Sequence, residues 1–502
     1  MMDTKFTDIL VIGSGVSGLF FAVKTAINRP DLQITIMTKA QADNSNTRYA
    51  QGGIAVVTDK LKDSFEKHIQ DTIQAGGGMG EEEVIKMVVY QAPERLKELL
   101  DFEVSFDKNH EGEWDLGLEG GHSEYRILHH KDISGLEIQQ KMLLQVQKFS
   151  NVKLLEDQFV LDLLSEEING EKQCSGAVFY DKKNKQTRVV LAKTVVMSTG
   201  GCGQVFKHTT NPDIATGDGI AMAYRVGATI KDMQYIQFHP TALYEKDRNP
   251  YFLISEAVRG FGAYIVNSQN KRFVFEYDTR GELATRDIVS KAIGTELLNS
   301  GESHVYLDCR HLNYDEFYKH FPTITTYCKE EGIDLRKDLI PIVPVAHYQC
   351  GGIKVDRNSE TTIQNLFAVG ECSCTGLHGK NRLASNSLLE ALVFAHQSSV
   401  YICEHIDNVL YALQPVFEYK IISDEDSERV KELKQQLKEI MTTLYIGTVE
   451  IDKVEEKMEI IRQEFEPYLN NQIITLDSKE FQNMFDTAIL IVKNYKKQIV
   501  EV

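Results

Sequence analysis

The sequence has few of the features that mark membrane, secreted or nucleic-acid-binding proteins. No apolar run in its 502 residues reaches the roughly 18–20 residues that a transmembrane helix needs. Lysine and arginine number 55 against 73 aspartate and glutamate residues, and the formal net charge of -18 repels phosphate backbones. Residues 1–8 lack the apolar region of a signal peptide. We therefore expect a cytoplasmic protein with no membrane partner and no nucleic-acid partner.

The eight cysteines are too scattered for a metal or iron–sulfur site. Only Cys372 and Cys374 are close, and the single residue between them differs from the two-residue gap of zinc knuckles and thioredoxin motifs. The spacing of an iron–sulfur cysteine array is missing. We expect reduced, mostly buried thiols and no metal site.

A chain of 502 residues is too long for one ordinary hydrophobic core, and its pattern changes several times. Residues 8–37 predict a strand, a helix and a second strand, which together form a βαβ unit. Residues 152–196 alternate as strands do, whereas residues 234–348 are rich in His, Tyr and Arg and are interpreted as an inserted domain. Charged amphipathic helices follow Pro415. The expected fold class is α/β with an added helical tail.

A glycine-rich turn joins the first predicted strand to the first predicted helix. Gly13, Gly15 and Gly18 have the spacing of the Rossmann fingerprint, whose glycines allow a tight turn, close approach of a pyrophosphate and close packing of helix on strand. The second strand ends at Thr38-Lys39, without the acidic residue that usually binds the ribose of NAD. The motif therefore predicts dinucleotide binding. The missing acidic residue argues against an ordinary NAD dehydrogenase and leaves open which dinucleotide binds.

Seven later motifs occur in a fixed order. They are NSNTRYAQGG at 44–53, TGDG at 216–219, HPT at 239–241, EAVRG at 256–260, TRDI at 285–288, HYQCGG at 347–352 and RLASNSL at 382–388. Together they resemble the flavoprotein family of succinate dehydrogenase, fumarate reductase and L-aspartate oxidase, over about residues 8–400. One such motif alone would be weak evidence, but seven in order make chance an unlikely explanation.

The resemblance implies a Rossmann-like FAD-binding domain in two pieces, residues 1–233 and 349–415. An α+β capping domain of residues 234–348 would be inserted between them, and residues 420–502 would form a C-terminal helical domain. Many succinate dehydrogenases link their flavin covalently to a histidine just before the position of Thr47. This chain has Asn46 there, so we expect non-covalent FAD.

The glycine fingerprint and the resemblance together predict the FAD contacts. These are Gly13, Ser14, Gly15, Val16, Ser17, Gly18, Lys39, Asn46, Thr47, Arg48, Tyr49, Ala50, Gln51, Gly52, Gly53, Asp218, Glu371, Ser387 and Leu388. The glycines after Gln51 allow the backbone to approach a flat ring. A helix beginning near Ser387 would direct its N-terminal amides at the negative charge of a reduced flavin. The alternative role of Ser387 is that of a plain helix N-cap.

The resemblance assigns substrate contacts to His239, His347 and Arg382, and Arg382 has the form of a bidentate carboxylate clamp. Thr241, Ser255 and Glu256 are expected as neighbours of the substrate. Arg286 matches the catalytic arginine of the family. It could act as an acid or base, or only electrostatically, because arginine is a reluctant base. The alternative is a structural salt bridge to Asp287 or Glu282.

The segment LEGGHSEYR at 118–126 looks like the L-aspartate oxidase branch of the family. Aspartate differs from succinate by an ammonium group, so a carboxylate at Glu119 would favour aspartate over plain dicarboxylates. The alternative is that Glu119 lies on a solvated surface loop. The implied reaction is oxidation of L-aspartate to iminoaspartate, with oxygen or fumarate as acceptor and quinolinate synthase as the next enzyme in NAD biosynthesis.

Two rival functions remain at this point: a soluble fumarate reductase or succinate dehydrogenase flavoprotein, and a non-catalytic flavin-binding or RNA-modifying scaffold. The sequence also departs from the family pattern in two places. Phe261 stands between two glycines where a glutamate is expected, and the tail lacks the expected Glu-Ser-Arg-Gly stretch. The contribution of the tail to the active site is therefore open.

Overall fold

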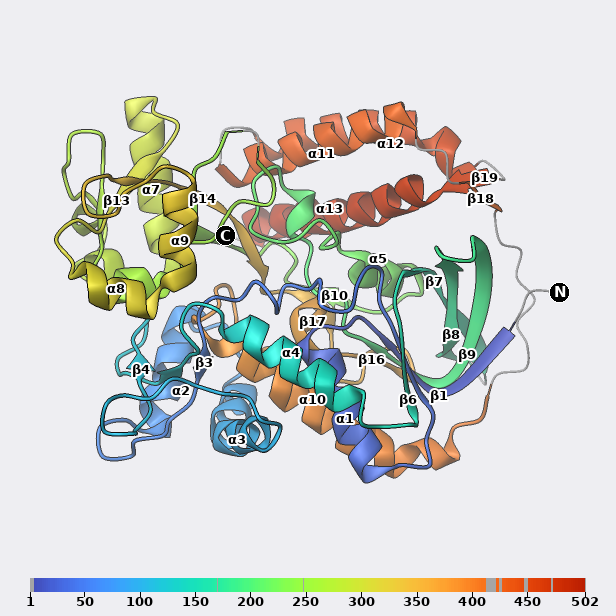
Figure 1. Ribbon diagram of the computed structural model, residues 1–502. Coiled ribbons are helices and arrows are strands. Elements are labelled where there is room, and N and C mark those ends of the chain that lie inside the picture. The colour runs from blue at the N-terminus through green and yellow to red at the C-terminus, as the bar shows by residue number, and fades with distance from the viewer. Residues whose placement is uncertain are drawn as a thin grey trace.

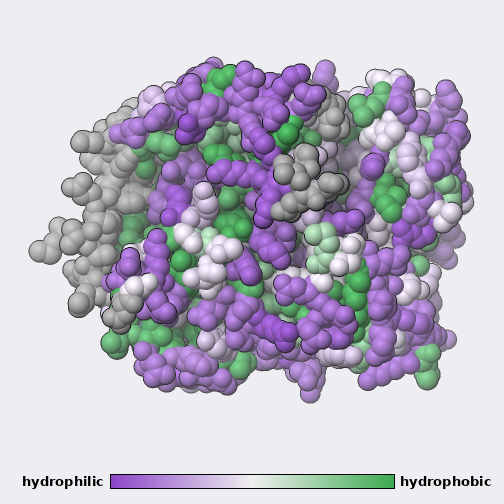
Figure 2. Space-filling view, turned by 180° about the vertical axis from the view of Figure 1, so that it is seen from behind, coloured by the Kyte–Doolittle hydropathy of each residue, from purple (hydrophilic) through white to green (hydrophobic). Residues whose placement is uncertain are grey.

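The computed structural model describes residues 4–168, 170–246, 248–411, 421–423, 427–446, 450–470 and 473–501. Within these ranges no helix is both long enough and apolar enough to span a bilayer. The expected boundary between residues 415 and 420 lies outside the described residues. Where Figure 2 shows the surface, hydrophilic residues cover most of the face and hydrophobic residues form small separate patches.

A seven-stranded sheet is the frame of the α/β part of the molecule, and its strands lie to the right in Figure 1. Its path is β6 (Val152–Leu155), β2 (Ile34–Met37), β1 (Thr4–Ile12), β9 (Gln186–Met197), β8 (Glu171–Asp181) and β7 (Gln158–Ile168), and β16 (Leu366–Ala368) also pairs with β9. Strand β9 is long enough to change partners along one edge. Residues 186–191 pair antiparallel with β8, and residues 195–197 pair parallel with β16. Strands from distant parts of the sequence therefore share one sheet.

Both faces of this sheet are buried, because successive residues of β1 belong to different cores. Ile9 and Val11 pack against helices on one face, whereas Leu10 and Ile12 pack into the core on the other. The helices of the first face are α1 (Val16–Asn28), α3 (Glu82–Asp101), α4 (Ser134–Val146) and α10 (Asn386–His405). Beside them lie α2 (Phe65–Ala75) and a small sheet of β3 (Ile54–Ala55), β5 (Ile127–Leu128) and β4 (Leu116–Gly117).

The turn between β1 and α1 has the geometry that its glycines predict. Gly13 has φ +113°, and a Cβ there would overlap the carbonyl of Ser198 at the end of the neighbouring strand. The Gly13 N–H donates to the carbonyl of Met37 at 2.8 Å, which fixes the turn above the end of β2. The N-terminal amides of α1 therefore face the space beyond the carboxyl ends of β1 and β2.

The cap is an antiparallel sheet with its own core. Its order is β11 (Ile236–Leu243), β14 (Ile340–Gln349), β13 (Val305–Asp308) and β12 (Tyr264–Val266), with helices α6 (Glu256–Gly260), α7 (Arg286–Ser300), α8 (Tyr314–His320) and α9 (Pro322–Glu330). A bulge interrupts the β11–β14 pairing between His239 and Ala242. Phe261 packs against Phe317 and Phe321, so this side chain belongs to the core of the cap.

Three C-terminal helices, in the upper part of Figure 1, pack on the second face of the seven-stranded sheet. They are α11 (Glu428–Ile446), α12 (Ile451–Asn470) and α13 (Leu476–Glu501), and they share one core with the sheet and with α5 (Asp218–Arg225). The short strands are β10 (Ile230–Lys231), β15 (Gly352–Lys354) and β17 (Ser373–Cys374) in one sheet, and β18 (Ile421–Ser423) with β19 (Ile473–Thr475) in another. The tail is thus packed onto the α/β core.

Candidate active site

A cavity of about 530 Å³ lies between the α/β core and the cap. Its walls come from the turn after β1, residues 44–53, the start of α10, and strands β11 and β14 of the cap. Every predicted cofactor and substrate residue lines it except Gly18 and Thr241. Gly18 packs α1 onto the sheet, because a Cβ there would collide with the carbonyl of Gly13 at 2.5 Å. Thr241 lies behind His239, and its hydroxyl donates to the carbonyl of Ile254 at 2.8 Å.

The polar atoms of the core side of the cavity fit FAD. In the described part of the chain, the side-chain oxygens of Asn44, Asn46 and Gln51 are buried and have no hydrogen-bond partner. Unpaired buried acceptors are costly, and the hydroxyls and ring N–H of FAD would supply the missing donors. The glycine turn and the start of α1 supply amides for the pyrophosphate. These residues would therefore hold FAD in this part of the cavity.

Asn46 is tied to Glu371 across the cavity wall. The Asn46 amide donates to Glu371 Oε2 at 2.8 Å, and the backbone N–H of Gln349 donates to Glu371 Oε1 at 3.1 Å. Burial raises the pKa of Glu371. An amide at position 46 offers no nucleophile to a flavin, which agrees with the prediction of a non-covalent cofactor.

The predicted contacts Lys39 and Asp218 form an ion pair with each other at 2.8 Å. Lys39 also pairs with Glu480 at 2.5 Å, and the amide of Asn483 donates to Asp218 at 2.8 Å. Both partners belong to α13. The sequence left the role of the tail open, and the structure shows that α13 supports this part of the cavity wall.

Ser387 is not the N-cap of α10, contrary to the alternative considered from the sequence. The N-cap is Ser385, which has a left-handed backbone with φ 61° and makes no capping side-chain bond. The hydroxyl of Ser387 instead accepts from Arg382 Nη1 at 2.6 Å. Ser387 therefore links a predicted substrate residue to the start of the helix that lines the cavity.

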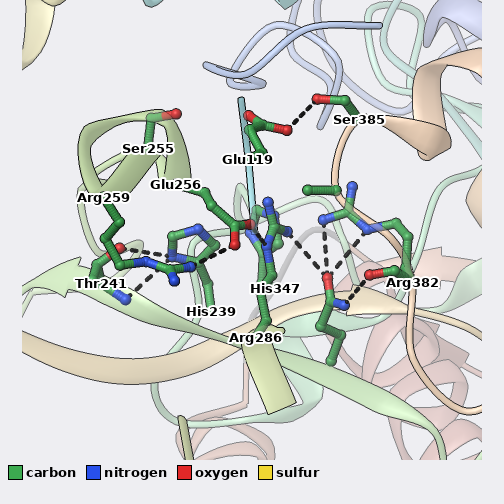
Figure 3. Close-up of polar contacts among 12 residues, drawn as sticks. Glu119, His239, Thr241, Ser255, Glu256, Arg259, Arg286, His347, Arg382 and Ser385 are labelled. Atoms are coloured by element: carbon green, nitrogen blue, oxygen red, sulfur yellow. Dashed lines mark hydrogen bonds and ion pairs between the residues drawn. The ribbon is translucent and has the colours of Figure 1, made fainter. Parts of the chain in front are cut away.

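The two arginines of the substrate region share one acceptor (Figure 3). Gln237 Oε1 accepts from Arg286 Nη1 at 3.1 Å and from Arg382 Nη2 at 3.0 Å. Arg382 also lies over the ring of Tyr348, 4.4 Å from its centroid. Burial and the charge of Arg286 lower the pKa of Arg382 to about 10, so it remains a cation at neutral pH. Two buried guanidinium groups side by side attract a dianion.

Arg286 is paired with Glu256 and not with Asp287 or Glu282, the partners considered from the sequence. Arg286 Nε donates to Glu256 Oε2 at 2.5 Å, and Arg259 Nη2 donates to Glu256 Oε1 at 2.6 Å. Burial alone would raise the pKa of Glu256, but the two arginines outweigh burial and hold this pKa below its usual value. Glu256 is therefore a carboxylate that fixes Arg286 at the cavity wall.

Two histidines from adjacent cap strands meet beside these arginines. The ring centroids of His239 and His347 are 5.0 Å apart, and Thr210 Oγ1 lies 2.7 Å from His347 Nδ1. Burial first, and Arg286 second, lower the pKa of both imidazoles well below the usual value, so both are neutral. Within the described residues, His239 Nε2 is buried and has no hydrogen-bond partner, which leaves it available to a ligand.

Glu119 lies inside the cavity and is only 2% exposed, so its alternative interpretation as a surface residue is wrong. Its Oε2 accepts from the hydroxyl of Ser385 at 2.5 Å. A Cβ on Gly52 would come within 2.8 Å of its Oε1, so the glycine allows the carboxylate to approach the predicted flavin loop. Burial and the nearby Glu256 raise the pKa of Glu119. A cation bound beside Glu119 would stabilise its carboxylate form and so oppose the increase in pKa that burial and Glu256 cause.

Sequence reasoning missed several members of this site, namely Gln237, Ser385, Thr210, Arg259 and Tyr348. Gln237 precedes His239 by two residues, so the period of a strand could have indicated it. Thr210 belongs to no motif, and its sequence neighbourhood carries no signal for its contact with His347.

Comparison with known proteins gives consistent results. The profile of the FAD binding domain family matches residues 8–388. A chloroplastic L-aspartate oxidase of Oryza sativa subsp. japonica is 39% identical over 521 residues, which cover 98% of this chain and 80% of that protein. The L-aspartate oxidase of Vibrio cholerae is 38% identical over 499 residues, covering 97% and 92%. The solved E. coli quinol fumarate reductase is similar with a TM-score of 0.87 and 28% identity, over 98% of this chain and 89% of that chain.

Proposed function

The chain belongs to the L-aspartate oxidases within the FAD-binding flavoprotein family, and from this membership we propose how its own residues carry out the reaction. The protein binds FAD non-covalently and oxidises L-aspartate to iminoaspartate in NAD biosynthesis. Oxygen or fumarate is the electron acceptor, and the similarity to a fumarate reductase agrees with the second of these. FAD, when bound, supplies the two-electron acceptor for the hydrogen of the substrate α-carbon.

The two carboxylates of aspartate are bound by the histidines and Arg286 of the cap together with Arg382 of the segment before α10. Arg382 presents a planar, charged donor surface, and the shared acceptor Gln237 holds it beside Arg286. The neutral His239 offers its unpaired Nε2. Thr241 acts behind these groups through its contact with His239. Ser255 lines the cavity itself and caps the helix that begins at Glu256.

Arg286 acts electrostatically during aspartate oxidation. Glu256 accepts a hydrogen bond from its Nε and stabilises the guanidinium cation, which opposes loss of a proton. A cation held at this point orients the carboxylate next to the α-carbon. The proton lost in forming the imine leaves the substrate ammonium and is released to water, so the reaction does not require Arg286 to accept it.

The observation that carries this proposal is the carboxylate of Glu119 inside the cavity, opposite two buried arginines. Plain dicarboxylates gain nothing from a negative group at this point, whereas the ammonium of aspartate does. The test is to measure hydrogen peroxide produced by the purified protein with L-aspartate in air. Production with aspartate and none with succinate is expected. Equal production with both would contradict the proposed role of Glu119.

The domain boundaries, partner and location are further proposals. We assign FAD binding to residues 1–233 and 349–415, capping to 234–348 and a helical role to 420–502. Quinolinate synthase is proposed to receive the product, because an imine hydrolyses in water and a rapid acceptor protects it. A coupled assay that yields quinolinate faster than free iminoaspartate decays would support this. Cell fractionation tests the proposed cytoplasmic location.

A further inference from the structure

We infer that His122 is a positioning residue for Glu119, and that it thereby helps to select an amino dicarboxylate over a plain one. The inference rests on the proposed role of Glu119. His122 belongs to the same loop as Glu119 but does not line the cavity, so any effect on the substrate must pass through its neighbours. The argument follows from the hydrogen bonds of its two ring nitrogens.

Arg126 fixes the tautomer of His122. Arg126 Nη1 lies 2.9 Å from His122 Nδ1, and because a guanidinium only donates, Nδ1 must be the acceptor. The proton of the neutral ring is then on Nε2, which donates to the carbonyl of Ala384 at 2.9 Å. Burial, and after it the charge of Arg126, lower the pKa of His122 to about 4, so the ring keeps this tautomer at neutral pH.

A closed ring of contacts connects His122 to the Glu119 carboxylate. Ala384 is followed directly by Ser385, whose hydroxyl donates to Glu119 Oε2 at 2.5 Å. On the other side, the backbone N–H of His122 donates to the backbone carbonyl of Glu119 at 3.2 Å. The side chain of His122 therefore sets the separation between the Glu119 loop and the segment that carries Ser385.

The loop side of this ring is anchored to the region of helix α2. Arg126 is fully buried and makes a bidentate pair with Asp63, with both N···O distances at 2.8 Å. It also donates to Asp71 at 2.5 Å, and Asp71 accepts from the backbone and the hydroxyl of Ser123. A buried bidentate arginine resists displacement, because removal of either partner leaves an unpaired charge.

The α10 side of the ring is anchored to the same helix. His68 Nε2 lies 2.9 Å from Asn386 Oδ1, and the Asn386 amide donates to Thr72 Oγ1 at 3.0 Å. Both sides of the ring are thus fixed to α2, and His122 supplies the cross-link between them. Loss of this cross-link frees the Ser385–Glu119 contact. Arg286 of the cap keeps its bond to Gln237, and Arg382, which lies before α10, keeps its own bonds to Gln237 and Ser387.

The test compares His122→Gln with His122→Asn in the FAD-loaded protein. A glutamine amide can place an N–H near the position of Nε2, whereas the shorter asparagine amide cannot reach Ala384. We measure kcat and KM for aspartate oxidation, and for fumarate reduction with a reduced dye. His122→Asn is expected to raise the KM for aspartate about tenfold, as loss of one hydrogen bond predicts, with less than about a twofold change for fumarate. His122→Gln is expected to retain most of the wild-type ratio of the two activities.

Thr25→Val is the matched control, because it removes a buried hydrogen bond to Ser399 at 2.9 Å that has no connection to the Glu119 loop. It is expected to leave the activity ratio unchanged, whatever it does to the melting temperature. Parallel loss of both activities in His122→Asn, or identical ratios in the Asn and Gln variants, would overturn the inference. If Glu119→Gln shifts the ratio and His122→Asn does not, only the positioning role fails. If neither shifts it, the proposed role of Glu119 fails first.

Discussion

Replacement of Glu119 by glutamine tests the substrate assignment most directly. The change keeps the shape of the side chain and its contact with Ser385, but it removes the negative charge from a position that is only 2% exposed. A hydrogen bond to a charged group contributes about 1.5–3 kcal/mol. Loss of that amount from the transition state for aspartate oxidation lowers kcat/KM by roughly one to two orders of magnitude.

Fumarate reduction provides the internal reference. Fumarate has two carboxylates and no ammonium, so it uses the arginines and gains nothing from a carboxylate at position 119. The same variant should therefore retain its fumarate reduction or increase it. The quantity to measure is the ratio of hydrogen peroxide formation with aspartate to fumarate reduction with a reduced dye. A general folding defect would lower both activities alike and leave this ratio unchanged.

The pH profile gives an independent measurement on the same variant. Burial and Glu256 raise the pKa of Glu119, so the protonated form persists to a higher pH than in a free glutamate. Only the carboxylate attracts the ammonium, and kcat/KM for aspartate in the wild type should therefore rise as pH rises through this pKa. This rise of kcat/KM at acidic pH should be missing in Glu119→Gln. Equal losses of both activities, with an unchanged acid limb, would refute the reasoning.

Four further predictions follow from the geometry. Arg382→Leu should raise the KM for aspartate by two or more orders of magnitude. Arg382→Lys should raise it by less, because lysine keeps the positive charge but cannot bind a carboxylate through two parallel hydrogen bonds. An unchanged KM would show that Arg382 does not bind a substrate carboxylate. Acid precipitation should release all the flavin, since position 46 is Asn, and yellow pellets would contradict this. The pKa of His122 in the folded protein is about 4, below that of an unfolded histidine. The unfolded protein therefore binds a proton first, so the unfolding free energy decreases as the pH falls from about 6.5 towards 4. His122→Gln should remove up to about 3 kcal/mol of that pH dependence in urea titrations; an unchanged pH dependence would show that folding does not lower the pKa of His122. Adding FAD to the apoprotein should slow amide hydrogen exchange in α13 more than in α12, and uniform protection would argue against coupling through Glu480.

The parts of the fold that local rules govern were predictable from the sequence. The β1–α1–β2 unit and its turn follow from an apolar run, three glycines and a helical period. The pairing of β16 with β9 was not predictable, because it joins residues 366–368 to residues 195–197 and depends on the point at which β9 leaves β8. A strand that changes partners along one edge has no local signature.

In the candidate site too, residues within motifs were predictable from the sequence, whereas contacts made by tertiary packing were not. His239, Arg286 and Arg382 were found because each belongs to a motif. Of their supporting partners, Gln237 was not found, and Glu256 was expected beside the substrate but not as the partner of Arg286. Both contacts with the arginines arise only through tertiary packing. The salt bridge considered for Arg286 was wrong for this reason: charged residues close in sequence were weighed, and the structure supplies a carboxylate thirty residues away.

Two residues of α13 connect the C-terminal helices to the wall of the cofactor cavity. Glu480 and Asn483 bind Lys39 and Asp218, both of which line the cavity. Burial alone would lower the pKa of Lys39, but the two carboxylates outweigh it and raise this pKa, so its ammonium stays charged. Docking of α13 and the arrangement of this wall are therefore one equilibrium. Any ligand that prefers the docked arrangement must stabilise the docking of α13 by the difference between its binding free energies for the docked and undocked arrangements. Although the tail lacks the expected Glu-Ser-Arg-Gly stretch, it can still affect the enzyme through this contact.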